Sequence, residues 1–349
     1  RRSGFWTLVA NAVARRPGLF LVTTTFVLAA MALGIPTLNP SFNFLEGLPE
    51  DTDSRLGFEL LQQSFPPGEL APTEVYISAA GRSLYDDLLA IERLAAELAG
   101  KELVVSVAGP TRPKGEPVSM GVEAFQAALA GIPDAVLSGE SLPVGLTPDQ
   151  MGAYGLYQAG RRFVSPDETT VRLELVFDAD PYSVDALDAI EAIRESARNS
   201  AANGALAGAE VVVGGPTAIE TDGRATLNRD ILLVTPIVIV AIWLILAMLV
   251  RSVVAPTYLV ASVLLSFAAA LGLSTLVFQN VLGHSGVGYS NSVFMFIFLV
   301  SLGADYNIYI ISRIREEVAT RGLLDGTRHA ISQTGGVITS AGIILAGTF

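Results

Sequence analysis

The chain has 349 residues, of which 51% are hydrophobic and 16% are charged, and its net charge at pH 7 is −12. This composition is too apolar for an ordinary soluble protein and predicts a membrane protein with a soluble part, while the acidity argues against nucleic acid as a partner. There is no cysteine and there are only two histidines, which excludes disulfides, thiolate metal sites and histidine-rich metal sites. No cofactor or metal is therefore expected.

Residues 1–36 are expected to form an interfacial helix followed by transmembrane helix 1. Residues 1–16 place Phe5, Trp6 and Leu8 at helical spacing among four arginines, a pattern typical of a helix at the cytoplasmic membrane surface. Residues 18–35 carry no charge and lie between two prolines. They fit either a short span or a signal peptide, and the later hydrophobic spans favour a helix that is retained.

Residues 37–230 have the pattern of a soluble domain. They hold 30 of the 34 acidic residues and 13 of the 22 basic residues, a net charge of −17. Apolar alternation and helical periodicity predict two β-α-β units, with strands at 74–79, 103–107, 169–177 and 211–213 and helices at 83–99 and 183–202. Ser183 is the expected N-cap of the second helix. The insertion between the units, at 109–166, has short helices expected at 122–130 and 148–160.

Residues 231–349 return to an apolar pattern that predicts transmembrane helices 2 to 4 and the start of helix 5. A polar helix at 218–230 leads directly into a span at 231–250, and further spans are expected at 253–278 and 292–312, with a glycine-rich turn at 279–291. Another hydrophobic helix is expected to begin at residue 335, with only 15 residues against the roughly 20 that a span needs. We therefore expect the chain to be a fragment.

The basic residues predict the orientation in the membrane. Nine of the 22 lie outside residues 37–230, and all nine fall on one side of the membrane if the first helix leads outward. Because basic residues collect on the cytoplasmic side, we expect a multi-pass protein of the bacterial inner membrane with a cytoplasmic N-terminus. The expected fold is a membrane α-helical bundle plus an extracytoplasmic α+β domain of ferredoxin-like βαβ-βαβ type, since each amphipathic helix needs a sheet face to cover.

Residues 292–317 contain the strongest functional candidate. A helix over residues 292–312 spans roughly 31 Å, and Asp305 lies roughly 20 Å from its first residue. A carboxylate at that depth costs about 2.5–3.5 kcal/mol, so a compensating role is expected. Asp305 and Tyr306 fit a proton relay, because burial favours the neutral carboxyl and water access can then load and release a proton. The alternative is a neutral, hydrogen-bonded structural aspartate.

Residues around Asp305 have expected supporting roles. Ser301 and Ser312 share its side of the helix and can hold water or hydrogen bonds. Gly303 is expected to let a neighbouring helix approach closely, in preference to acting as a hinge. Arg313 and Arg315 are expected to anchor the topology, and a pairing of Arg313 with a carboxylate is the alternative.

Other motifs favour ordinary structural roles. Residues 214–217 lack the spacing of known phosphate-binding loops and predict a tight turn. His284 is expected to be solvated. No G-x-S-x-G or H-E-x-x-H sequence occurs, so no enzymatic activity is expected.

Residues 303–307, with the sequence GADYN, and 312–317, with SRIREE, resemble the fourth transmembrane helix of the MMPL family, the mycobacterial membrane protein large group within the resistance-nodulation-division superfamily. The stretches 44–53, 65–71 and 214–218 agree with this resemblance. It implies an exporter driven by the proton-motive force, often of lipids or other hydrophobic molecules. In that reading Asp305 and Tyr306 form the proton relay, and residues 37–230 form the porter domain.

The resemblance covers an N-terminal half and implies a second, similar half whose matching Asp-Tyr helix faces Asp305. That half is missing from this sequence, so it is an expected partner along with membrane lipids and a hydrophobic substrate. Two alternatives from other classes stay open: a non-transporting lipid-binding or sensing membrane protein, and a protein-translocation accessory.

Overall fold

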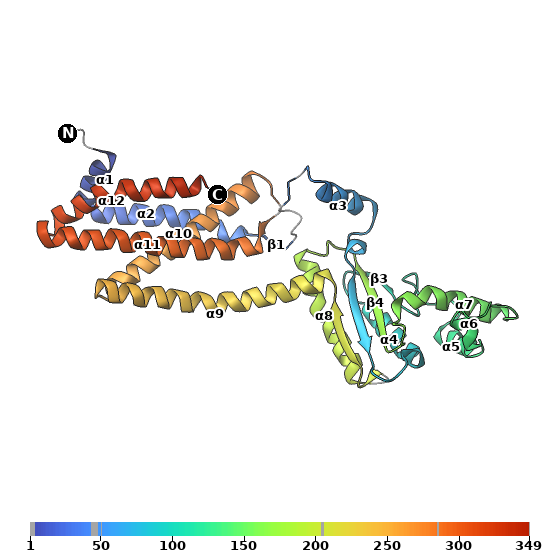
Figure 1. Ribbon diagram of the computed structural model, residues 1–349. Coiled ribbons are helices and arrows are strands. Elements are labelled where there is room, and N and C mark those ends of the chain that lie inside the picture. The colour runs from blue at the N-terminus through green and yellow to red at the C-terminus, as the bar shows by residue number, and fades with distance from the viewer. Residues whose placement is uncertain (1–3, 43–47, 50, 204–205, 285, 349) are drawn as a thin grey trace. The chain divides into compact units, whose positions relative to one another are not determined.

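The computed structural model describes residues 4–42, 48–49, 51–203, 206–284 and 286–348 (Figure 1). Residues 44–47 and 50 of the family-like stretch 44–53 lie outside the described residues, as do Arg1, Arg2 and Phe349. The chain forms two compact units, one from Phe42–Leu227 and one from Arg1–Ser41 together with Asn228–Phe349. We call them the sheet unit and the helical unit, and describe each by itself.

The sheet unit contains a four-stranded antiparallel sheet. Its strands are β2 (Thr73–Ser78), β3 (Val104–Ala108), β4 (Thr170–Phe177) and β5 (Glu210–Gly214), in the spatial order β3-β4-β2-β5. Helix α4 (Leu88–Ala99) connects β2 to β3, and α8 (Val184–Ala202) connects β4 to β5. The two predicted β-α-β units are therefore present, and they interleave so that the first strand of each unit lies in the middle of the sheet.

The core of the sheet unit lies where one sheet face meets the two helices. Residues alternate between buried and half-buried along β2 and β4, as expected for strands with one covered face. The predicted apolar face of the first helix is buried, with Leu84, Leu88, Ile91, Leu94 and Leu98 all in the core. The helix begins as a 3-10 turn at Leu84–Asp87, and Ser183 caps α8 by accepting a hydrogen bond from the Ala186 N–H, as predicted.

The insertion between β3 and β4 is a small helical cluster. It contains α5 (Val122–Ala130), α6 (Asp134–Leu137) and α7 (Pro148–Gly160), which Figure 1 shows grouped together. The bounds of α5 and α7 are those predicted from the sequence. Thr147 and Gln150 form a capping box at the start of α7, which satisfies backbone donors that have no partner within the helix. Ahead of the sheet lie α3 (Asp53–Ser64) and a 3-10 turn at Pro67–Leu70.

The helical unit begins with α1 (Phe5–Arg15) and α2 (Pro17–Ala32), and continues with the later part of α9 (Pro216–Val250), α10 (Val254–Thr275), α11 (Tyr289–Arg321) and α12 (Leu323–Ala346). The chain passes from one unit to the other within α9, which is one uninterrupted helix. Helix α2 packs very closely on α10: a Cβ atom on Gly272 would lie only 2.3 Å from the Met31 carbonyl oxygen. Small residues permit such contacts between membrane helices.

Within the described residues, four helices are long and apolar enough to cross a membrane: Pro17–Thr37, Pro216–Val250, Val254–Val281 and Asn291–Arg321. Three of them contain a complete span predicted from the sequence, and the remaining one, Val254–Val281, begins one residue after the start of the predicted span 253–278. The expected turn at 279–291 is partly wrong, since a π-helical turn at Leu276–Val281 extends α10 and α11 already begins at Tyr289. The last helix begins at Leu323, twelve residues before the predicted start.

Two segments distant in sequence meet beside these spans. Strand β1 (Pro40–Ser41) pairs in parallel with β6 (Val287–Gly288). The Gln279 side chain closes the same junction, since its Nε2 donates to the Asn39 carbonyl at 2.9 Å and its Oε1 accepts from the Asn39 N–H at 3.2 Å. This pairing, which the sequence pattern did not predict, connects the chain after α2 to the chain before α11.

Candidate functional site

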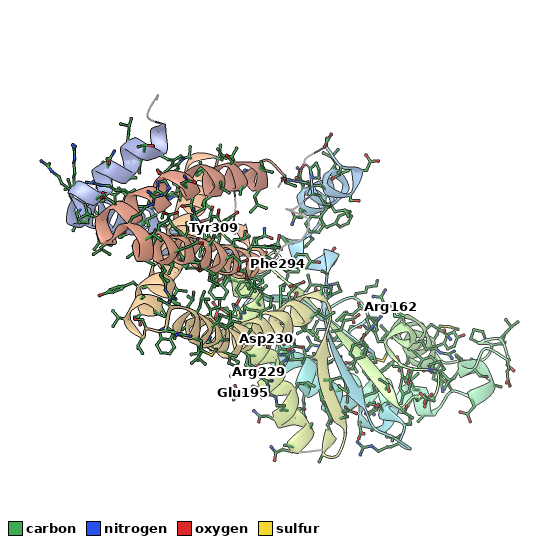
Figure 2. All side chains as sticks on the ribbon, turned by 60° about the vertical axis from the view of Figure 1, so that its left-hand side comes forward. Arg162, Glu195, Arg229, Asp230, Phe294 and Tyr309 are labelled. Carbon is green, nitrogen blue, oxygen red and sulfur yellow. The ribbon has the colours of Figure 1, made fainter. Side chains whose placement is uncertain are left out.

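Helix α11 presents Asp305 on a face that the described part of the chain leaves open. Five exposed residues share one side of the helix because they recur at intervals of three to seven positions: Phe294, Ser301, Asp305, Tyr309 and Ser312. Phe294 and Tyr309, both visible in Figure 2, are 57% and 46% exposed. Within the described residues the Asp305 carboxylate makes no hydrogen bond or ion pair.

The opposite face of α11 packs on α10. Val300 and Ala304 are buried, and a Cβ atom on Gly303 would lie 3.0 Å from both methyl carbons of Val263. The Asn307 side chain donates from Nδ2 to the Leu259 carbonyl oxygen at 3.5 Å. These contacts fix the rotation of α11, and that rotation turns Asp305 away from α10.

The structure therefore places the candidates predicted from the sequence on different sides of α11. Ser301 and Ser312 lie on the side of Asp305, one turn before it and two turns after it. Gly303 lies on the packed face, where it meets Val263 of the neighbouring helix. Tyr306 is half-buried between the two faces, because adjacent residues of a helix are rotated by about 100°. Asp305 and Tyr306 thus point in different directions from the same turn.

A second polar cluster surrounds Glu317 near the end of α11. The residue is only 7% exposed, and its carboxylate accepts from Arg313 Nη2 and Arg321 Nε, each at 2.7 Å. His329 Nε2 of α12 lies 3.9 Å from the same carboxylate. Arg313 therefore pairs with a carboxylate, that of Glu317, as in the alternative considered for it. Arg315 donates from Nη1 to the Leu249 carbonyl oxygen, 2.6 Å away near the end of α9.

Sequence reasoning missed Glu317 and Asn307. The spacing of Arg313, Glu317 and Arg321 at four-residue intervals was a signal for ion pairs along one helix face. It gave no indication that the carboxylate would be buried. The sequence did not indicate a partner for Asn307, because an amide inside an apolar helix can donate a hydrogen bond to any neighbouring carbonyl.

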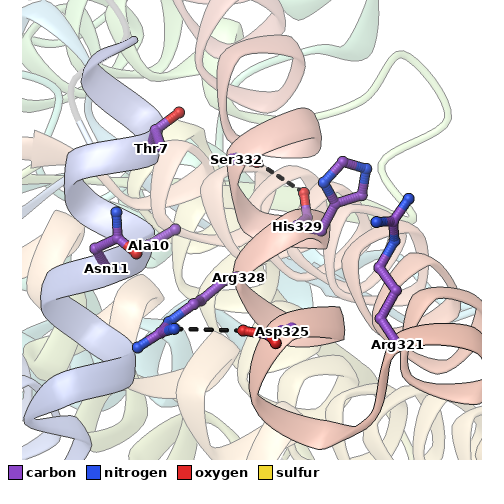
Figure 3. Close-up of a pocket in the computed structure, with 8 residues that line it drawn as sticks. All are labelled: Thr7, Ala10, Asn11, Arg321, Asp325, Arg328, His329 and Ser332. Atoms are coloured by element: carbon purple, nitrogen blue, oxygen red, sulfur yellow. Dashed lines mark hydrogen bonds and ion pairs between the residues drawn. The ribbon is translucent and has the colours of Figure 1, made fainter. Parts of the chain in front are cut away.

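A polar pocket of about 440 Å³ lies between α1 and α12 (Figure 3). The polar residues that line it include Thr7, Asn11, Arg321, Asp325, Arg328 and His329. Arg328 Nη1 lies 3.3 Å from the Asp325 carboxylate. The remaining motifs carry no such cluster: among the described residues no group of three or more potential metal ligands is present, and Gly215 has a φ of +94°, as a tight turn requires.

Comparison with known proteins gives a family match. The family model described as MMPL family matches residues 46–349. A membrane protein of Streptomyces coelicolor is 32% identical over 349 residues, which is 100% of this chain and 35% of that relative. The apo-petrobactin exporter of Bacillus anthracis is 30% identical over 350 residues, covering 100% of this chain and 39% of that protein. The sulfolipid-1 exporter MmpL8 of Mycobacterium tuberculosis is 39% identical over 231 residues, which is 63% of this chain and 21% of that protein. The chain thus spans less than two fifths of the length of these relatives.

Proposed function

This chain belongs to the MMPL family of membrane proteins, and on that premise we propose that it forms part of an exporter driven by the proton-motive force. The observation that carries the proposal is the open face of α11, which presents Asp305 midway along a helix that can span the membrane. A carboxylate at that depth is costly unless it has a function or a partner. Asp305 and Tyr306 are proposed as the relay, with Asp305 binding the proton and the Tyr306 hydroxyl lying on its route.

The proposed cargo is a lipid or another hydrophobic molecule. One relative supports this class by its name, an exporter of sulfolipid-1, while the relative named as an exporter of apo-petrobactin supports export in general. A transporter role is also in keeping with the lack of any recognisable hydrolase motif in the sequence. The supporting roles proposed for Ser301 and Ser312 are to hold water beside Asp305, and that for Gly303 is helix packing.

Residues 37–230 are proposed as the extracytoplasmic porter domain, between an N-terminal part at 1–36 and a membrane part at 231–349. The strand order β3-β4-β2-β5, with helices α4 and α8 as crossovers, supports a ferredoxin-like fold for this domain. Basic residues at span ends, among them Arg15, Arg16, Arg251 and Arg321, support a cytoplasmic N-terminus in a bacterial inner membrane.

A second half with a matching Asp-Tyr helix is the proposed partner of the open face. The relatives that match across the whole of this chain are two and a half to three times as long, which leaves room for such a half. Its helix would cover Asp305 and supply the groups that exchange the proton with it.

The relay is tested by Asp305→Asn in a complete family protein that contains this chain. The substitution keeps the size of the side chain but removes its ability to ionise, so export should fall to background while membrane insertion is unchanged. Asp230→Asn, which removes an exposed carboxylate from another spanning helix, is the matched control and should export normally. Undiminished export by Asp305→Asn would refute the relay.

A proton uncoupler separates the exporter from the first alternative, a non-transporting lipid-binding or sensing protein. Export should stop when the gradient collapses, whereas a lipid-binding or sensing protein would keep its ligand affinity and show no gradient-dependent release. The readout is cargo appearing outside cells or inside inverted vesicles, before and after the uncoupler is added.

A further inference from the structure

The pocket between α1 and α12 lies at the membrane boundary. Its α1 residues, Thr7, Ala10 and Asn11, precede the span Pro17–Thr37, and its remaining residues begin at Arg321, where the span Asn291–Arg321 ends. Both sets therefore fall at the depth where a helix leaves the apolar layer and meets lipid headgroups. Phe5 of α1 is 70% exposed, which suits a helix that lies in this interface.

The charges that line the pocket favour an anion. Arg321, Arg328 and, when it is protonated, His329 face a single carboxylate from Asp325 within the lining. The Asp325 side chain is 74% exposed and lies 3.3 Å from Arg328, so water screens that pair. Arg321 is shared with Glu317, which leaves Arg328 as the cation most available to a ligand.

Arg328 also has an unsatisfied donor. Its Nε atom is buried and has no hydrogen-bond partner within the described part of the chain. A buried N–H without an acceptor is costly, and a phosphate oxygen matches the fork of a guanidinium group in charge and geometry. The Thr7 hydroxyl and the Asn11 amide, on the α1 side of the pocket in Figure 3, offer further donors.

We propose that this pocket binds the phosphate group of an anionic phospholipid. Basic pockets between membrane helices are suited to such headgroups, and the interfacial position of α1 favours a lipid over a soluble phosphate. The site depends only on the chain lying in a membrane, and it is independent of the proton relay and of any cargo. The bound lipid would hold α1 against α12 by bonding to both.

The two tryptophans of the chain provide a local test. Trp6 precedes Thr7 and packs against Gly335 of α12, whereas Trp243 lies in α9. Trp243→Phe leaves Trp6 as the only tryptophan, and Trp6→Phe leaves Trp243 as the control. The full chain is placed in nanodiscs of phosphatidylcholine that contain an equal mole fraction of either dibrominated phosphatidylglycerol or dibrominated phosphatidylcholine. Trp6 should be quenched at least about threefold more strongly by the anionic lipid, and Trp243 equally by both.

Matched variants distinguish the pocket from general surface charge. Arg328→Gln should remove the preference of Trp6 for the anionic lipid, and Arg328→Lys should retain part of it. Asn11→Leu should reduce it without any change in charge. Arg15→Gln, which removes an arginine of α1 that does not line the pocket, should leave it intact. Unchanged Trp243 quenching in each variant reports intact insertion.

Three results would overturn the proposal. The first is equal quenching of Trp6 by the two lipids, and the second is a loss in Arg15→Gln as large as in Arg328→Gln. The third is abolition of the lipid preference by millimolar inorganic phosphate at constant ionic strength, which would assign the pocket to a soluble anion instead.

Discussion

The sheet unit and the membrane helices use the same apolar side chains in opposite ways. Leu173 and Leu175 in β4 are fully buried, whereas Leu232 in α9 is 75% exposed. In the most apolar stretch of the α9 span only 6% of the residues are buried within the protein. The sheet unit thus carries its own hydrophobic core, while the spans leave most of their apolar surface to lipid or to other protein.

Helix α11 combines both behaviours in one element. Its packed face, with Val300 and Ala304, behaves like a protein core, and its open face carries Asp305 with Phe294 and Tyr309. A polar group on an open face has no structural reason within the described residues. The comparison therefore shows that no contact within the described residues accounts for Asp305.

The largest contrast is expected from one substitution made in each unit. Leu173→Ala should destabilise the sheet unit by about 2–5 kcal/mol, because it removes a fully buried side chain and leaves a cavity. Leu232→Ala, in the helical unit, should change the stability of the sheet unit by less than about 0.5 kcal/mol. Both effects are measured by urea unfolding of the full chain in detergent, with protease cleavage of the sheet unit as the readout of its unfolding. Equal effects would contradict the division into a self-contained core and lipid-facing spans.

A smaller contrast is expected between the two faces of α11. Gly303→Leu should destabilise the packing of α11 on α10 by about 1–3 kcal/mol, since even a Cβ atom would lie 3.0 Å from Val263. Ser301→Leu adds the same side chain on the open face and should leave thermal unfolding of the chain in detergent unchanged. A loss of stability in Ser301→Leu would show that the open face is covered within this chain.

The smallest effect is expected at a helix cap in the sheet unit. Ser183→Ala removes the side-chain acceptor for the Ala186 N–H and should cost about 1 kcal/mol. Ser200→Ala, in the last turn of the same helix, is the control and should be neutral or slightly stabilising. Both are measured by the midpoint of urea unfolding. A neutral Ser183→Ala would mean that water replaces the cap at no cost.

Local sequence signals predicted the sheet unit closely. The bounds of α5 and α7, the cap at Ser183 and the buried face of the first helix all follow from periodicity and capping, which act over a few residues. The start of α12 at Leu323 was missed because Asp325, Arg328 and His329 interrupt the apolar pattern. In the structure the charges of Asp325 and Arg328 pair one turn apart, so the helix tolerates them.

The candidate site was only partly predictable. Asp305 stood out because a charge in an apolar run is rare on energetic grounds. Which neighbours it would have could not be predicted, since the rotation of α11 depends on how Gly303 meets Val263. The burial of Glu317 depends in the same way on α12 folding back after Gly322, a tertiary event that spacing along one helix does not reveal.

The two residues of the Asn39–Gln279 junction are synthesised at very different times. The two residues are 240 positions apart, and the entire sheet unit lies between them in the sequence. A ribosome that adds about 5–20 residues per second needs roughly 12–48 s to travel from one to the other. During that interval α2 must remain inserted without α10, the helix against which its glycine contacts are made, while the sheet unit emerges and folds. The span Pro17–Thr37 is therefore made well before the helix that it packs against.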